Sequence, residues 1–335
     1  MSALVDRFGR VHRDLRISLT DRCSLRCSYC MPADGVPWIA KDNILTTDEL
    51  VRVTTVAAGL GITEVRLTGG EPLLRRDVVD VVRRIARIEG ERGPLEVSIT
   101  TNAIRLPKLA GPLRDAGLRR VNISIDTLRR DRFAEITRRD RLDDVLAGIE
   151  AARVAGFAPL KLNAVLLRGV NDDEAVDLVR FAASIGAELR FIEHMPLDAG
   201  HTWSRAAMVD GVEILEALSS AFLLTPVGER GSAPAEEFLI DGGPTRVGVI
   251  ASVTAPFCGA CDRVRLTADG QIRNCLFARD EFDLLRVLRS GMRDDAIDVR
   301  IAEVLSRAIA AKLPGHGINE PGFLQPDRPM SAIGG

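Results

Sequence analysis

The sequence predicts an α/β protein: an incomplete, six-stranded (β/α)6 barrel of the TIM type, followed by a smaller α+β extension. Two observations support this fold class. Six strand-like runs alternate with helical patterns at intervals of roughly thirty residues, which implies a parallel sheet with right-handed crossovers. In addition, apolar and polar residues alternate within each run, so one face of the predicted sheet is polar.

The expected elements follow one another along the chain. Strands are expected at 14–20, 63–68, 95–100, 121–126, 160–166 and 188–194, and helices at 47–60, 76–89, 107–116, 141–155, 172–185 and 209–219. Start signals support two helices, with Thr46 or Thr47 before Asp48-Glu49 and Asn171 before three acidic residues. From about residue 221 the pattern changes to short β-like runs at 222–227, 238–240, 245–250, 263–266 and 271–273. We therefore divide the chain into a barrel domain (1–220) and a C-terminal domain (221–335).

The alternation within the strands favours a barrel with a polar interior. A common eight-stranded barrel is filled by branched apolar side chains, and a strand covered on both faces reads as a continuous apolar run. Here Leu15, Ile17 and Leu19 share one face of the first strand. The other face of the six strands carries Arg16, Ser18, Thr20, Arg66, Thr68, Ser98, Thr100, Asn122, Ser124, Asp126, Lys161, Asn163 and Arg190. An antiparallel sheet with a solvated face would also alternate, but the intervening helices argue against it.

Composition is that of an ordinary globular protein. Hydrophobic residues make up 46% of the 335 residues, and the formal net charge of −2 argues against a general nucleic-acid binder. No apolar run approaches the roughly 20 residues of a membrane span, and the N-terminus lacks the apolar region of a signal peptide. We expect a cytoplasmic protein.

The six cysteines form two triplets. Cys23, Cys27 and Cys30 follow the first strand at C-x3-C-x2-C, and Cys258, Cys261 and Cys275 stand at C-x2-C-x13-C. A [4Fe–4S] cluster normally takes four cysteines, so each triplet would leave one iron open for a substrate or cofactor. Structural zinc requires a closed shell of four ligands, and disulfides are disfavoured in a reducing cytosol. Two iron–sulfur clusters are the simplest interpretation.

Cations gather on the polar face of the predicted barrel. Arg16, Arg66, Lys161 and Arg190 come from four different strands. Because an uncompensated buried charge costs about 3–5 kcal/mol, the group needs anions. A phosphate chain suits arginine forks, whereas internal ion pairs remain the alternative. Thr68-Gly69-Gly70-Glu71-Pro72 ends the second strand, where paired glycines allow close backbone approach.

These motifs resemble those of the radical S-adenosylmethionine (SAM) enzymes, and among them the GTP 3′,8-cyclases of molybdenum cofactor biosynthesis. The resemblance rests on the first cysteine triplet with Tyr29 before its last cysteine, on Gly-Gly-Glu-Pro, on the second triplet with Arg263 and Arg265, and on the final Gly334-Gly335. It covers nearly the whole chain. It implies an incomplete barrel with one cluster that binds and cleaves SAM, and a second cluster in the C-terminal extension that binds the guanine of GTP.

The resemblance also implies roles for individual residues. The first triplet would hold the SAM cluster, and the second would hold the auxiliary cluster. The implied SAM contacts are Tyr29, Gly69, Gly70, Glu71, Ser124 and Met195. The implied GTP contacts are Arg16, Arg66, Thr100, Lys161, Arg190, Arg263, Val264 and Arg265. Arg263 and Arg265 are the catalytic candidates, for the reductive quench of the substrate radical, and the diglycine tail would reach the active site.

The implied reaction converts GTP to (8S)-3′,8-cyclo-7,8-dihydroguanosine 5′-triphosphate, by way of a deoxyadenosyl radical. The implied partners are a flavodoxin- or ferredoxin-like electron donor and, downstream, cyclic pyranopterin monophosphate synthase, and a homodimer is left open. Relatives carry a basic residue where this chain has Glu64, which would repel a triphosphate unless it turns aside. Alternative functions are a radical enzyme acting on a peptide or another small molecule, an iron–sulfur electron carrier and a zinc-stabilised binding module.

Overall fold

The computed structural model describes residues 3–334, which form an α/β fold around one large sheet. Its strands are β1 (Asp14–Ser18), β2 (Glu64–Thr68), β5 (Glu96–Thr101), β6 (Arg120–Ser124), β7 (Lys161–Val165), β8 (Glu188–Ile192), β9 (Leu224–Pro226), β10 (Glu236–Ile240), β11 (Arg246–Ile250), β12 (Arg263–Leu266), β13 (Gln271–Arg273) and β14 (Phe282–Asp283). A separate small ribbon pairs β3 (Glu89–Gly90) with β4 (Gly93–Pro94).

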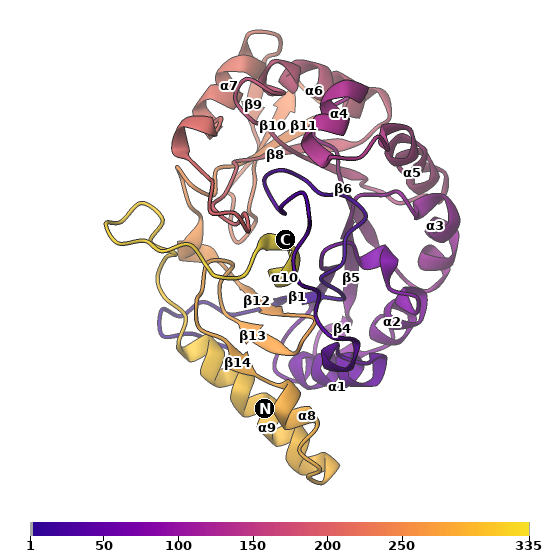
Figure 1. The fold of residues 1–335 in the computed structure, drawn as a ribbon, viewed down its shortest axis with the longest axis vertical. Coiled ribbons are helices and arrows are strands. Elements are labelled where there is room, and N and C mark those ends of the chain that lie inside the picture. The colour runs from indigo at the N-terminus through magenta and orange to yellow at the C-terminus, as the bar shows by residue number, and fades with distance from the viewer. Residues whose placement is uncertain (1–2, 335) are drawn as a thin grey trace.

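Most of the sheet is parallel. The 12 strands lie in the order β14-β13-β12-β1-β2-β5-β6-β7-β8-β11-β10-β9. All neighbours from β12 to β11 pair in parallel, whereas the strands beyond them pair antiparallel. The sheet curves around α10, near residues 330–333 (Figure 1). This arrangement is consistent with the predicted partial barrel.

Helices cover the convex side of the sheet. Helices α1 to α7 follow its outer side in Figure 1, and α8 and α9 lie beyond the β13–β14 edge. Their bounds are α1 (Thr47–Ala58), α2 (Val78–Ile85), α3 (Leu106–Asp115), α4 (Arg130–Thr137), α5 (Leu142–Val154), α6 (Ala175–Ser184), α7 (Gly211–Ser219), α8 (Leu285–Leu288), α9 (Asp294–Ala310) and α10 (Met330–Ile333). None of the helices in the described range 3–334 is long and apolar enough to cross a membrane.

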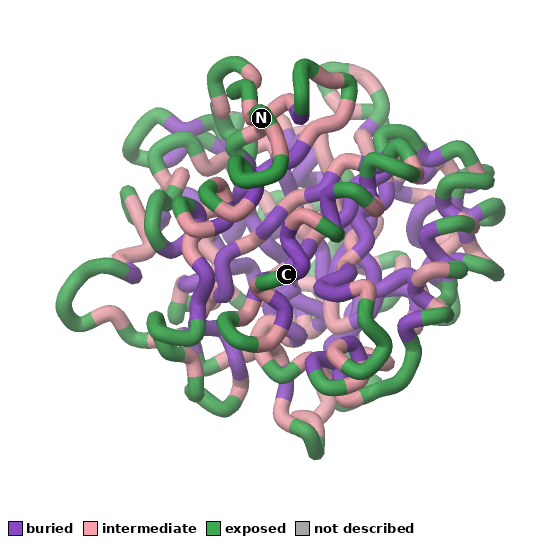
Figure 2. Tube along the Cα trace, turned by 90° about the horizontal axis from the view of Figure 1, so that it is seen from above, coloured by how far each residue is buried: buried purple, intermediate pink, exposed green. Residues whose placement is uncertain are grey.

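The alternation of the strands separates an apolar core from a polar interior. Leu15 and Ile17 of β1 are fully buried in the main hydrophobic cluster, together with the matching residues of the other parallel strands. Between them Arg16 points the other way and lines a cavity. Figure 2 shows the buried trace in the middle of the molecule and the exposed segments around it. The strand pattern therefore sets which face binds helices and which faces the interior.

The C-terminal part of the chain extends the barrel sheet at both of its edges. β11 pairs in parallel with β8, and β12 pairs in parallel with β1. The sequence analysis assigned these two strands to the C-terminal domain. In the structure they are hydrogen-bonded to β8 and β1, the outer two of the six strands expected for the barrel. The segment 251–262, which joins β11 to β12, therefore connects the two edges of the parallel array.

Four helices, α4, α8, α9 and α10, lie where the sequence analysis expected none. α4 covers residues after β6, and α9 follows the short strands of the C-terminal part. α9 buries Ile297, Ile301, Leu305 and Ile309, which recur every four residues or so along one side. This helix packs against α1. This apolar period is present in the sequence. Because short β-like runs were expected after residue 221, no helix was predicted in this part of the chain.

The two expected helix starts have different outcomes. Thr46 caps α1, because its hydroxyl accepts from Glu49 N while the Glu49 carboxylate accepts from Thr46 N. Asn171 does not cap a helix. Its side chain instead binds the backbone of two loops, as described below. The following residues 172–174 form a 3-10 turn before α6 begins at Ala175.

Candidate active site

A cavity of about 330 Å³ lies at the carboxyl ends of the parallel strands, where barrel enzymes place their active sites. All six cysteines line it, although the two triplets are more than two hundred residues apart in sequence. The other fourteen candidate residues lie on strands of the sheet or on loops that follow them. The size of the cavity matches that of small-molecule sites, which begin at about 300 Å³.

The first triplet lies on the loop that follows β1. Turns form where Cys30 N and Met31 N donate to Cys27 O, at 3.0 and 2.9 Å. Burial, followed by the charge of Glu71, raises the pKa of Cys23 to about 11, and burial raises that of Cys30 to about 12. Free thiols in such surroundings are inert, so a bound metal must displace their protons.

The glycine motif after β2 is hydrogen-bonded to the backbone of this cysteine loop. Gly70 N donates to Thr20 O and Glu71 N donates to Arg22 O, both at 2.7 Å. A Cβ on Gly70 would lie 2.4 Å from Arg22 O, so only glycine fits. The sequence analysis expected the glycines to admit a ligand. In the structure their first effect is to let two backbone segments meet.

Glu71 is buried and accepts three hydrogen bonds from protein groups. They come from Thr101 Oγ1 at 2.7 Å, Asn102 N at 2.7 Å and Leu73 N at 2.9 Å. The carboxylate therefore joins the end of β2 to the end of β5, beside the first triplet. Asn102 reaches further, since its Nδ2 lies 3.0 Å from Ser24 Oγ and 3.8 Å from Cys23 Sγ.

Tyr29 connects the cysteine loop to the end of β6. Its hydroxyl donates to Asp126 Oδ2 at 2.7 Å, and Asp126 Oδ1 accepts from Val165 N at 2.9 Å. Burial raises the pKa of Asp126 to about 6, against the opposing effect of these two hydrogen bonds. Ser124, two residues earlier, and Met195, after β8, line the same cavity.

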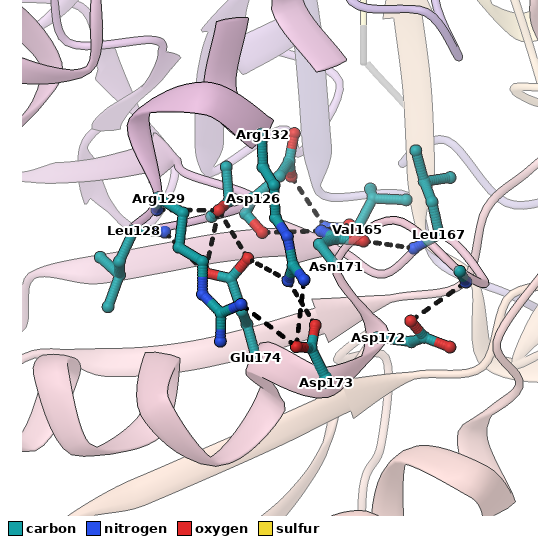
Figure 3. A network of polar contacts seen from close by, with 12 residues as sticks. Asp126, Leu128, Arg129, Arg132, Val165, Leu167, Asn171, Asp172, Asp173 and Glu174 are labelled. Atoms are coloured by element: carbon teal, nitrogen blue, oxygen red, sulfur yellow. Dashed lines mark hydrogen bonds and ion pairs between the residues drawn. The ribbon is translucent and has the colours of Figure 1, made fainter. Parts of the chain in front are cut away.

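Asn171 fixes the loops behind Asp126 (Figure 3). Its Nδ2 donates to Asp126 O at 2.7 Å and Val165 O at 3.0 Å, and its Oδ1 accepts from Leu167 N at 2.7 Å. The buried carboxylate of Glu174 accepts from Leu128 N at 3.0 Å in the same network. These contacts hold the ends of β6 and β7 together at the rim of the cavity.

The second triplet lies between the two edges of the parallel array. Cys258 and Cys261 belong to the segment joining β11 to β12, and Cys275 follows β13. Burial raises the pKa of the Cys258 thiol, but the opposing charges of Lys312 and Arg263 bring that of Cys261 below its usual value in spite of burial. The surroundings of this triplet are thus more positive than those of the first.

Three arginines form a row across adjacent strands. Arg265 on β12 is in register with Arg16 on β1, which is in register with Arg66 on β2, and all three line the cavity. Burial, followed by the charge of Arg66, lowers the pKa of Arg16 to about 9, and burial, followed by Arg16, lowers that of Arg265 to about 9. Like charges placed side by side are unfavourable, so this row calls for an anion.

Carboxylates satisfy the row only in part. Asp14 Oδ2 lies 3.5 Å from Arg16 Nε and 3.7 Å from Arg263 Nε. Among the described residues Arg16 Nε has no hydrogen-bond partner. Within residues 3–334, the hydrogen-bond partner of Arg66 Nε is the hydroxyl of Ser98, at 3.4 Å. An anionic ligand in the cavity would supply what these buried guanidinium groups lack.

Of the other predicted GTP contacts, some line the cavity and some do not. Thr100 and Arg190 line the cavity, and Arg190 is also 3.3 Å from Glu237. Lys161 and Val264 are not among the residues that line it. Lys161 Nζ pairs with Glu188 at 2.8 Å, and Val264 is buried in the apolar core.

Glu64 and the C-terminal tail also have defined positions. Glu64 turns to Arg120 on β6, 3.1 Å away, and so does not stand free among the cations. Gly334 lies against Ser18 and Thr68, and its carbonyl oxygen accepts from Arg265 Nη1. The second tail residue, Gly335, is outside the described residues.

The cysteines fit clusters better than single ions. All six carry free thiols, and within residues 3–334 no three His, Cys, Asp or Glu side chains converge closely enough for one metal ion. A mononuclear zinc site needs such convergence, whereas a cluster separates the sulfurs of its ligands. The donor set, three thiols that line a cavity and would bind metal as thiolates, fits an iron–sulfur cluster with one open iron.

Comparisons with known proteins agree with this chemistry. Residues 17–182 match the model of the radical SAM superfamily, and residues 187–318 match that of the C-terminal region named Molybdenum Cofactor Synthesis C. A GTP 3′,8-cyclase of Streptomyces coelicolor is 57% identical over 335 residues, covering 99% of this chain and 96% of the relative. The chain belongs to the GTP 3′,8-cyclase family of radical SAM enzymes.

Further relatives and solved structures extend the comparison. GTP 3′,8-cyclase 2 of Mycobacterium tuberculosis is 54% identical, covering 99% of this chain and 92% of the relative. The structure of Streptococcus suis SuiB bound to S-adenosylmethionine has a TM-score of 0.62 at 14% identity, covering 91% of this chain and 69% of that one. The latter likeness shows the fold alone. The radical SAM family implies one [4Fe–4S] cluster and SAM.

Sequence reasoning missed several residues around the site. Asp126 was read as one of several polar strand residues, and Asn102 was not considered. Arg10 and Lys312 were also missed, although both contact segments of the second triplet. Scarcity was a signal for Lys312, since lysine occurs at only four positions (Lys41, Lys108, Lys161 and Lys312).

Proposed function

We propose that this chain converts GTP to (8S)-3′,8-cyclo-7,8-dihydroguanosine 5′-triphosphate, the first step of molybdenum cofactor biosynthesis. One observation carries the proposal: two cysteine triplets and a row of arginines line a single cavity in a chain that is 57% identical to a GTP 3′,8-cyclase over its full length. This arrangement supports radical chemistry and recognition of a polyanion at one site.

The first triplet, Cys23, Cys27 and Cys30, would hold the SAM cluster. When bound, the cluster and SAM would supply the one-electron chemistry that is needed to take the 3′ hydrogen atom from the ribose of GTP. The chain positions the cofactor and excludes water. The implied SAM contacts that line the cavity are Tyr29, Gly69, Gly70, Glu71, Ser124 and Met195.

The second triplet, Cys258, Cys261 and Cys275, would hold an auxiliary cluster in the C-terminal part of the chain, with guanine at its open iron. Arg16, Arg66, Thr100 and Arg190 would surround the phosphates and ribose. Lys161 would join them only by exchanging its contact with Glu188 for one with phosphate, and Val264 would contribute its backbone alone.

Arg263 and Arg265 are the proposed catalytic residues. After C3′ of the ribose has bonded to C8 of guanine, one electron and one proton complete the cyclised product. Arg265 lies beside Arg16 and touches the C-terminal tail, so its charge would stabilise the electron-rich product of this step. The electron would come from an external flavodoxin- or ferredoxin-like donor.

The experiment supplies GTP, SAM and reductant without oxygen to the wild type and to Arg265→Ala. Two products are measured, deoxyadenosine from SAM and cyclised GTP. We expect cyclised GTP to fall by about 100-fold in the variant, the scale of losing one group that stabilises developing charge, while SAM cleavage persists. Arg83→Ala, on the half-exposed face of α2, is the matched control. Undiminished cyclised product would remove the role of Arg265.

The wider setting belongs to the same proposal. The cyclised product would pass to cyclic pyranopterin monophosphate synthase, and the protein would work in the cytoplasm, as a homodimer or as a monomer. Direct binding of GTP to the reconstituted protein separates this function from a radical enzyme acting on peptides. A chain that does not bind GTP would contradict the assignment of the substrate.

A further inference from the structure

A buried lysine faces the second cysteine triplet from outside the predicted site. Lys312 follows the end of α9 and is 3% exposed. Its Nζ lies 3.5 Å from Cys261 Sγ and donates to Arg263 O at 2.7 Å. Burying an ammonium group is costly unless it is paired. Among the contacts recorded for residues 3–334, its partners are this sulfur and this carbonyl oxygen, with no carboxylate in an ion pair.

The chain around Lys312 is fixed to the segments of all three cysteines. Next to Cys275, Asn274 Nδ2 donates to Ala308 O at 2.9 Å. Arg10 joins the other side, since it donates at 2.7 Å both to Leu313 O and to Cys258 O. The end of α9 is therefore held in one place relative to the triplet, and the ammonium group cannot move far from Cys261.

The charge around Cys261 is positive on the side of Lys312. Arg263 Nη1 lies 4.0 Å from Cys261 Sγ, so two cations approach the same sulfur. The potential of an iron–sulfur cluster depends on net charge, on hydrogen bonds to its sulfurs and on exposure. A fixed cation that donates to a ligand sulfur acts through the first two of these.

We propose that Lys312 is a positioning residue of the second cluster: its ammonium group stabilises the Cys261 thiolate and raises the cluster's reduction potential. The proposal rests on the proposed function, because it requires a cluster at the second triplet. The step concerned is the uptake of one electron from an external low-potential reductant, in which no bond forms or breaks. The added electron is stabilised by a nearby positive charge. Through the Arg263 carbonyl, Lys312 also fixes the start of β12, which carries both proposed catalytic arginines.

The test measures the second cluster alone. In the full chain, Cys23, Cys27 and Cys30 are changed to alanine, so that only the second triplet can hold iron, and the protein is reconstituted without oxygen. Lys312→Met removes the charge at similar volume, Lys312→Arg keeps it, and Lys108→Met, at an exposed position on α3, is the control. Iron and sulfide are counted, and the midpoint potential is titrated with dithionite by electron paramagnetic resonance.

We expect Lys312→Met to shift the midpoint potential to more negative values, Lys312→Arg to shift it less, and Lys108→Met to leave it unchanged. Loss of iron from Lys312→Met with retention in Lys312→Arg would equally support a role for the charge. An unchanged potential at full iron content in Lys312→Met would overturn the proposal, and so would equal loss of iron from both Lys312 variants.

Failure of the proposed function gives a different result in the same experiment. A chain with all six cysteines and the native Lys312 should hold about eight iron atoms, four for each cluster. If that chain holds only about four, the second cluster does not exist, and both proposals fall together. If it holds about eight while Lys312→Met behaves as the native chain, only the role of Lys312 is overturned.

Discussion

Single residues in this site act mainly by fixing backbone segments around the cavity. Gly70, Glu71 and Asn171 each bind main-chain groups of a loop that follows a different strand. Few of these contacts involve a group that would react. The arginines, by contrast, are poorly satisfied without a ligand. The site therefore combines a rigid rim with an interior that gains stability when an anion binds.

Gly70→Ala should disrupt the first triplet. The new Cβ would lie 2.4 Å from Arg22 O and 2.5 Å from Asp21 O, which are backbone atoms and cannot yield without moving the cysteine loop. We expect the reconstituted variant to hold about four fewer iron atoms per chain, the content of one [4Fe–4S] cluster, and to stop cleaving SAM. Gly111→Ala is the control, because nothing lies within 4 Å of its Cβ position. Normal iron content in Gly70→Ala would contradict the close-approach argument.

Asn171→Ala should destabilise the rim and weaken SAM binding. It leaves a buried backbone carbonyl of Asp126 and half-buried backbone groups of Val165 and Leu167 without their partner. At about 1–3 kcal/mol for an unpaired buried group, we expect a loss of about 2–3 kcal/mol in the free energy of unfolding, measured with urea. Asn43→Ala, at an exposed position, should change it little. A Kd for SAM equal to that of the wild type would show that the rim does not position the cofactor.

Helices and strands were predictable where the signal is local. The apolar–polar alternation of β1 and the Thr46–Glu49 pair gave the right element in the right place, because period and capping act between near neighbours. The pairing of β12 with β1 and of β11 with β8 was not predictable, since nothing in a five-residue strand specifies a partner far along the chain. Lys312 was missed for a similar reason: a lysine after a helix usually reads as a favourable charge at its C-terminus.

Asp210→Ala tests a local signal of this kind. Asp210 caps α7, accepting from Val212 N and Glu213 N at 2.9 Å, and Glu213 completes the capping box. We expect the free energy of unfolding to fall by about 1 kcal/mol, with SAM cleavage unaffected because α7 lies outside the cavity. Glu216→Ala, on an exposed turn of the same helix, should cost less. An equal effect of the two changes would argue against the cap.

At the scale of the whole molecule, strands from the N-terminal and the C-terminal parts of the chain form one continuous sheet. The six strands expected from the sequence are flanked by β11 and β12, so neither β8 nor β1 is an edge. The expected boundary at residue 220 remains a prediction. Hydrogen bonding across it links the two parts closely.

The fragment 1–220 should therefore not fold as a stable monomer. Without residues 221–335, β1 and β8 would expose unpaired backbone groups on strands with apolar faces, which promotes aggregation. We expect the fragment alone to be insoluble or to lack a cooperative urea transition. Co-expression with 221–335 is the control, and it should recover soluble protein. A soluble fragment that unfolds cooperatively by itself would support an independent barrel domain.

The contact of Arg10 with Cys258 and Leu313 has a consequence for the order of biosynthesis. Cys23, Cys27 and Cys30 are made before most of the sheet, whereas the second triplet is held by contacts of Arg10 and of residues 308–313. The first triplet also depends on late segments, because β1 and β8 gain their neighbours β12 and β11 only after residues 246–266 have been made. We therefore expect iron to be inserted at both triplets only after residues 246–313 have been made and have folded.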